Sequence, residues 1–116
     1  MNVNNILMGL KDVTGLPVAP DVYTGTAKKW ITFTYEDERP AISADDEVKG
    51  DTAYIQVQLY TPVEFDYLTL KAQIKEYLES IEDAVVPSVR SFVTIYTSSE
   101  KKVRQTVFSV EITRWR

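Results

Sequence analysis

Asp45, Asp46 and Glu47 form a run of acidic side chains in this 116-residue chain, and carboxylate oxygens are the ligands that hard cations prefer. Their spacing does not match a calcium-binding loop, and adjacent acids on a polar segment are typically solvated. We therefore expect no metal site here. A segment that becomes ordered on meeting a partner fits this composition better.

The chain has little of the equipment that catalysis requires. It contains no histidine and no cysteine, which excludes a Ser-His-Asp triad, disulfides and thiolate metal sites. Glu79 and Glu82 have no visible partner for acid–base work, and a solvated helix face explains them better. A Ser-Lys or threonine-based device stays open, but no motif indicates one, and the four glycines form no phosphate-binding loop. We expect no enzyme, no catalytic residue and no cofactor.

Basic residues lie near aromatic or strand residues at two places. Lys28 and Lys29 precede Trp30, and Lys101, Lys102 and Arg104 cluster near the carboxyl end. Such clusters can bind nucleic acid, but lysines also protect turns and sheet edges from unwanted pairing. The net charge of −4 argues against nucleic acid, so we expect no direct sequence-specific binding of it.

Length and composition predict one domain spanning residues 1–116. Apolar residues at helical spacing predict helices over residues 2–13 and 64–83. Apolar alternation predicts strands over residues 30–35, 53–60, 91–97 and 102–115. The expected fold is α+β: a four-stranded antiparallel sheet with two helices packed on one face, in the order α-β-β-α-β-β. The core we expect comprises Ile31, Phe33, Ile55, Val57, Leu59, Leu70, Ile74, Leu78, Phe108 and Val110.

The segment from Glu36 to Asp51 separates the first two predicted strands. It is polar and acidic, with Ile42 and Val48 as its only bulky aliphatic residues. Loops of this length are usually functional or disordered. We predict a long loop that is ordered only by a neighbouring subunit or another partner. No signal peptide and no membrane-spanning stretch is expected.

A stripe of polar and aromatic residues is expected on the face of the second strand away from the core. Its members are Tyr54, Gln56, Gln58 and Tyr60, with Trp30, Thr32 and Thr34 beside them. Tyrosine and tryptophan are enriched at protein interfaces, but they are also common on any strand. An interface and an ordinary solvated face remain equally open interpretations.

This layout resembles the tail-completion or tail-terminator proteins of long-tailed phages and prophages, which are also called head–tail joining or minor structural proteins. The resemblance covers nearly the whole chain and rests on loose patterns. These are Ile6-Leu7, Leu16-Pro17-Val18, Trp30-Ile31-Thr32-Phe33, Arg39-Pro40-Ala41, Ala44-Asp45-Asp46, Tyr54-Ile55-Gln56-Val57 and Phe108-Ser109-Val110-Glu111-Ile112.

The resemblance implies a protomer that joins copies of itself into a ring, commonly a hexamer, at the head-proximal end of the tail tube. Its partners would be the tail-tube protein and the head connector proteins. Its location would be the virion tail, and the host cytoplasm during assembly. The interface residues we expect are Trp30, Asp45, Asp46, Glu47, Tyr54, Gln56, Gln58, Tyr60, Lys101, Lys102 and Arg104. A small ligand-binding domain or enzyme subunit is an alternative, as is a regulatory protein-binding module.

Overall fold

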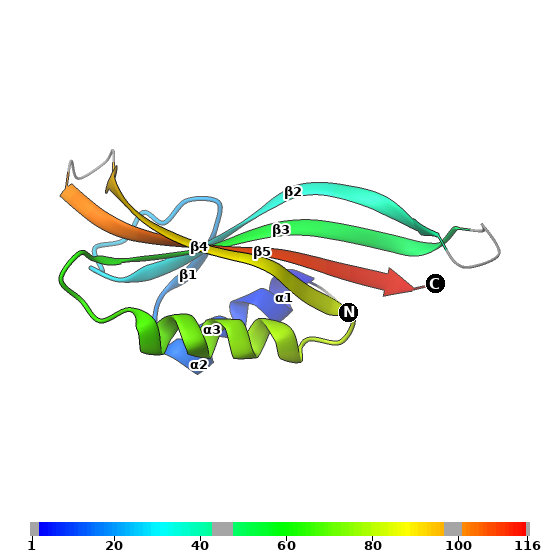
Figure 1. Cartoon of the computed structure of the whole chain (residues 1–116), viewed down its shortest axis with the longest axis horizontal. Coiled ribbons are helices and arrows are strands. Elements are labelled where there is room, and N and C mark those ends of the chain that lie inside the picture. Colours follow the sequence, from blue (N-terminus) through cyan, green and yellow to red (C-terminus); the bar gives the residue numbers. More distant parts are fainter. Residues whose placement is uncertain (1–2, 43–47, 97–100, 116) are drawn as a thin grey trace.

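One sheet of five strands, ordered β1-β2-β3-β5-β4, forms the frame of the protein (Figure 1). This computed structural model describes residues 3–42, 48–96 and 101–115. All neighbouring strands are antiparallel except β1 and β2, which are parallel. The strands are β1 (Val18–Pro20), β2 (Trp30–Ile42), β3 (Val48–Pro62), β4 (Ala84–Tyr96) and β5 (Lys101–Trp115).

The predicted four-stranded antiparallel sheet is therefore wrong, because it lacks the parallel strand β1. This strand lies between the first predicted helix and the first predicted strand, where the sequence analysis predicts no element. It is only three residues long, too short to show alternation, and backbone hydrogen bonds hold it in place. Ile31 N–H donates to the Pro17 carbonyl at 2.9 Å, and Asp21 N–H donates to the Phe33 carbonyl at 2.9 Å.

Strand lengths also differ from the sequence prediction. Most of the expected loop between residues 36 and 51 continues β2 and β3 as a long hairpin, and only residues 43–47 lie outside the described residues. Similarly, β4 begins at Ala84, seven residues before the predicted strand. Polar side chains hide the extension of β2 and β3, because a strand that does not cover a core needs no apolar face. In β4, Ala84, Val86 and Val89 do pack against the core, but Pro87 and a register shift between Val85 and Ser88 interrupt the alternation.

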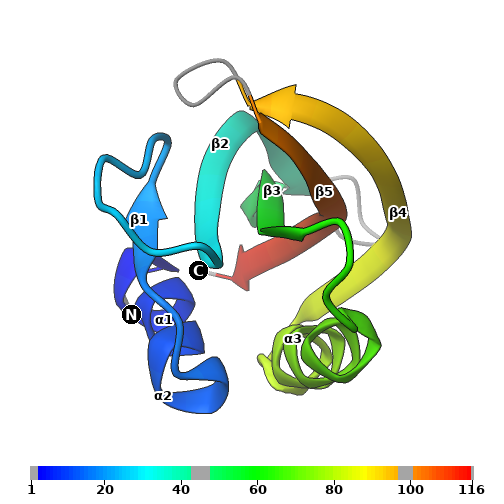
Figure 2. The same ribbon diagram turned by 90° about the vertical axis from the view of Figure 1, so that its left-hand side faces the viewer.

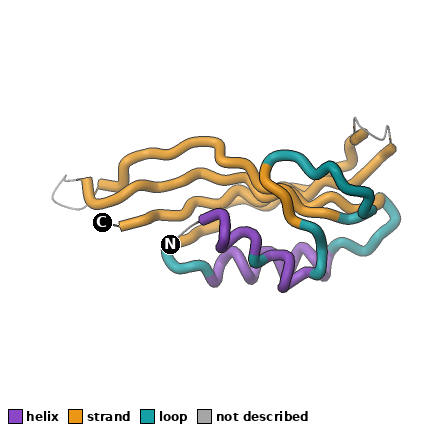
Figure 3. Tube along the Cα trace, turned by 180° about the vertical axis from the view of Figure 1, so that it is seen from behind, coloured by secondary structure: helices purple, strands orange, loops and turns teal. Residues whose placement is uncertain are grey.

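Three helices pack together on one face of the sheet (Figure 3). The predicted amino-terminal helix is divided at Gly9 into α1 (Val3–Met8) and α2 (Leu10–Thr14). Gly15 ends α2 with a left-handed conformation, φ 73°. Helix α3 (Leu68–Ser80) is shorter than predicted, and the Asp66 carboxylate accepts a hydrogen bond from its first N–H at 3.1 Å.

The core lies between these helices and the sheet, and its predicted members are confirmed as buried. Leu7 and Leu10 from the first two helices join it. Seen end-on, the sheet curls, with β2 and β4 on opposite sides and the helices beneath (Figure 2). The molecule is elongated, with extents of 51 × 24 × 22 Å.

Ile55 and Ile95 differ in burial, so replacing each of them with alanine should lower the free energy of unfolding by different amounts. Ile55 is 1% exposed in the core, whereas Ile95 is 61% exposed on β4. Ile55→Ala should lower the free energy of unfolding by about 2–5 kcal/mol, because it leaves a cavity. Ile95→Ala should change it by no more than about 0.5 kcal/mol. Urea denaturation of both variants measures the difference, and equal midpoints would refute the core assignment.

Gly9 and Tyr77 should be energetically coupled. The Tyr77 hydroxyl donates a hydrogen bond of 2.6 Å to the Ile6 carbonyl, and a Cβ on residue 9 would overlap that hydroxyl. Burial, and secondarily the charge of Asp12, raise the pKa of Tyr77, which keeps the donor protonated. Gly9→Ala should therefore destabilise the protein more in the natural background than in Tyr77→Phe. A double-mutant cycle should give a coupling of about 0.5–3 kcal/mol, and strict additivity would contradict this contact.

Candidate protein-interaction surface

The expected polar–aromatic stripe lies together on the face of β2 and β3 opposite the helices. Sheet register places Trp30 beside Tyr60, Thr32 beside Gln58 and Thr34 beside Gln56. Much of the stripe is covered, however: Trp30, Thr32 and Gln58 are buried. Only part of this expected interface is therefore available to a partner in the isolated protomer.

Stacking of aromatic rings explains why Trp30 is covered. The chain between β1 and β2 brings Tyr23 onto the Trp30 ring at a centroid distance of 5.5 Å, and Tyr60 stacks against Trp30 at 5.0 Å. Offset stacked pairs of this kind contribute about 0.5–1.5 kcal/mol each beyond the area they bury. These stacking contacts hold the segment between β1 and β2 against the sheet.

The polar side chains of the stripe form hydrogen bonds with one another. Thr32 Oγ1 donates to Gln58 Oε1 at 2.7 Å, and Gln58 Nε2 donates to Gln56 Oε1 at 3.1 Å. Buried polar groups cost free energy unless they are hydrogen-bonded, so this chain of bonds lets polar residues occupy a covered layer.

A partly open pocket of about 860 Å³ lies beside the aromatic stack. Trp30 forms part of its wall, and residues 22–28 form another part. Lys28, Lys101 and Lys102 contribute positive charge, against the single negative charge of Glu64. This chemistry suits an acidic segment of a partner better than a reaction.

The remaining expected interface residues are scattered. Arg104 is half-buried, with its guanidinium over the Tyr67 ring at 4.6 Å, so it is tied to the protomer. Tyr54 is also half-buried, under the guanidinium of Arg39 at 5.1 Å. Asp45, Asp46 and Glu47 lie outside the described residues.

Strand β4 carries a feature that the sequence analysis missed. It is one edge of the sheet, so its outer backbone groups have no strand partner among the described residues. Phe92, Val93 and Ile95 on this strand are 42%, 48% and 61% exposed. Long apolar edge strands readily pair with another chain. The available signal was the adjacent pair Phe92-Val93, which puts apolar side chains on both faces of one strand.

The opposite side of the sheet has an open edge of different character. Strand β1 covers β2 only at Ile31, Thr32 and Phe33, and no described strand pairs with the outer side of β2 beyond them. The exposed segment that follows contains three acids and one arginine, which are Glu36, Asp37, Glu38 and Arg39.

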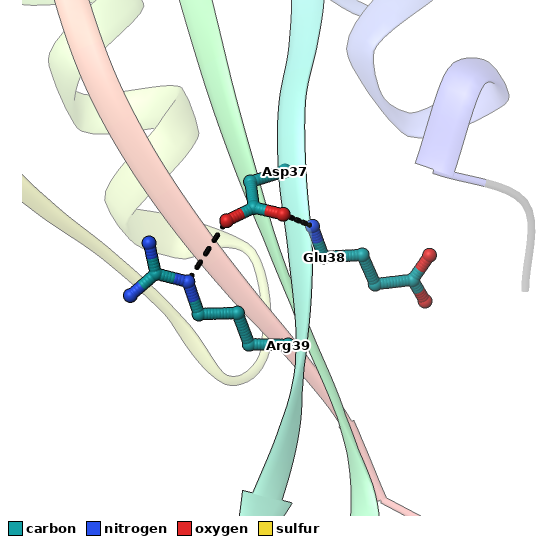
Figure 4. A network of polar contacts seen from close by, with 3 residues as sticks. All are labelled: Asp37, Glu38 and Arg39. Carbon is teal, nitrogen blue, oxygen red and sulfur yellow. Dashed lines mark hydrogen bonds and ion pairs between the residues drawn. The ribbon is translucent and has the colours of Figure 1, made fainter.

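Asp37 organises this acidic segment (Figure 4). Arg39 Nε and the Glu38 N–H both donate to its carboxylate at 2.8 Å. These bonds, that of Arg39 first, lower the pKa of Asp37, and Asp37 in turn raises the pKa of Arg39. Both side chains are exposed, so the ion pair contributes little to stability. Glu36 and Glu38 are exposed on either side of Asp37.

No protein-family model matches the chain, and no curated protein sequence matches it. A solved structure with a similar arrangement is a chain of the virion of a native gene transfer agent particle. The TM-score is 0.48 and the identity 17%, over 97% of this chain and 92% of the other.

Among the described residues, no helix is long and apolar enough to cross a membrane, and no group of three or more acidic side chains is placed to hold a metal ion.

The fluorescence of each tryptophan alone should show that Trp30 is covered by the aromatic stack and that Trp115 is exposed. Trp30 is 7% exposed and Trp115 is 53% exposed. Acrylamide should quench the fluorescence of Trp30→Phe, which retains Trp115, much more steeply than that of Trp115→Phe. Equal Stern–Volmer slopes in the folded proteins would contradict the covered stack, and unfolded samples of both variants provide the control.

Proposed function

We propose that this chain is a structural protein of a phage-like virion that assembles with copies of itself into a closed ring. The ring, expected to be a hexamer, completes the tail at its head-proximal end and joins it to the head. Its partners are further copies of itself, the tail-tube protein and the head connector proteins. It acts in the virion tail, after assembly in the host cytoplasm.

The observation that carries this proposal is the open apolar edge of β4. Monomeric proteins usually blunt such an edge with charges, proline or a covering element. Here Phe92, Val93 and Ile95 stay exposed, so a further strand would bury apolar area on both faces. The sequence resembles the tail-completion family, and this resemblance is the reason for placing the ring at the tail.

Charge distribution supports side-by-side assembly. The acidic segment 36–39 belongs to one flank of the sheet, and the exposed Lys101 and Lys102 lie next to β4 on the other. Complementary patches of this kind steer encounter and fix register more than they add affinity. In the assembled ring, acidic residues of one subunit face basic residues of the next.

A small-molecule binding role is the alternative, and the pocket beside Trp30 favours it. A screen of small carboxylates and phosphates by thermal denaturation separates the two functions. A ligand whose stabilising effect is lost in Lys101→Ala, in a protein that never assembles, would support the alternative.

Tails assembled without this protein should be defective. In particles that lack the gene, electron microscopy should show tails of irregular length that fail to join heads, because no ring caps the tube. Supplying the unmodified gene in trans should restore uniform, joined tails. Normal tails on normal particles in its absence would rule out the proposed role.

Native mass spectrometry of the purified protein tests self-assembly directly. The expected result is a concentration-dependent conversion from monomer to one closed multiple, with added tail tube promoting it. A monomer that persists at high concentration and with tail tubes present would contradict the ring.

A further inference from the structure

We propose that the ring forms by sheet extension: the acidic segment of β2 in one copy pairs antiparallel with the open half of β4 in the next copy. This inference rests on the proposed function and names its contact. The two segments are residues 34–39 and residues 88–95.

The structure restricts which part of β4 can accept a strand. Pro87 has no backbone donor, and a proline on an edge strand is a device that blocks pairing. The first part of β4 is therefore closed to a partner, and the part from Ser88 to Ile95 is open. Phe92, Val93 and Ile95 all lie in the open part.

The corresponding segment of β2 is bounded as well. Strand β1 occupies the outer side of β2 up to Phe33, and Pro40 interrupts the donors further along. The segment between them runs from Thr34 to Arg39, and its register with β3 shifts between Tyr35 and Asp37. It contains the exposed apolar ring of Tyr35, whose hydroxyl donates to Asn4 Oδ1 at 2.9 Å.

Strand directions decide the orientation of the contact. Each of the pairs β2–β3, β3–β5 and β5–β4 is antiparallel, so β4 runs opposite to β2. A neighbour related by rotation about an axis close to the strand direction therefore presents its β2 antiparallel to β4. Antiparallel pairing is slightly more stable per residue than parallel pairing.

Charge favours this occupant over a second β4. Residues 34–39 carry Glu36, Asp37 and Glu38, of which Asp37 is already engaged by Arg39. The single charge on β4 is Arg90, which is exposed within the open half. Pairing β4 with a second β4 would leave both arginines without an acidic partner from that strand.

The pairing requires a stagger between subunits. Through successive strand pairs, Trp30 is level with Tyr60, Gln105 and Phe92. A neighbour that places Glu36 beside Phe92 is displaced by six residues, or about 20 Å along the strand. In a closed barrel such a stagger is taken up by tilting the strands relative to the axis.

Cysteine cross-linking tests the contact, since the natural chain has no cysteine. A Glu36→Cys/Phe92→Cys double variant, whose two thiols share one face in this register, should give a covalent ladder ending at the ring when treated with a flexible bis-maleimide. Each single-cysteine variant, treated in the same way, should give no cross-linked product. The matched control is Glu36→Cys/Gln73→Cys, in which the second thiol lies on the exposed side of α3 and should give no ladder.

The outcomes separate this inference from the proposed function. Dimers from Phe92→Cys alone would show β4 pairing with itself, and would overturn the inference while leaving self-assembly intact. A ring without a ladder from the double variant would also overturn it. Failure of the unmodified protein to assemble, even with tail tubes, would instead remove the proposed function.

Charge exchange gives a second test with folded variants. Arg90→Glu should raise the concentration for half-assembly by up to about fivefold, as expected for one partly exposed ion pair. Combining it with Glu38→Lys should restore assembly toward the natural level. Circular dichroism checks that each variant is folded, and the absence of any rescue would contradict the pairing.

Discussion

The difference in rise per residue between a strand and a helix determines how much of the sheet the helices can cover. A strand advances about 3.3 Å per residue and a helix only 1.5 Å. Strands β3 and β5 have 15 residues and would span about 50 Å. Helix α3 has 13 residues and spans about 20 Å. The helices therefore cover only part of the sheet, and the hairpin of β2 and β3 projects beyond them (Figure 1).

That mismatch determines where apolar and polar residues are placed. Under the helices, β2, β3 and β5 supply an apolar core. On the reverse face, the aromatic stack around Trp30 and the hydrogen bond between Thr32 and Gln58 stabilise a covered polar layer. Outside both regions the strands are exposed, so their edges can serve as contact surfaces.

The sequence predicted the parts of the fold that are bound to the core. Alternation located the inner segments of the strands, and burial of Ile55 and Phe108 followed from it. Alternation failed beyond the core, where residues 36–39 are polar on both faces and yet form part of a strand. It also could not detect β1, which depends on a backbone contact with Ile31. The edge position of β4 depends on pairings between distant segments, so it required the structure.

The strands pair in a different order from the one in which they are synthesised. Strand β3 lies beside β5, but α3 and β4 come between them in the chain. Closing such a large loop is entropically unfavourable until the contacts it permits have formed. Among the described strands, β4 pairs with β5 alone, and β5 is the last strand of the chain. The place of β4 in the sheet therefore depends on the residues that leave the ribosome last.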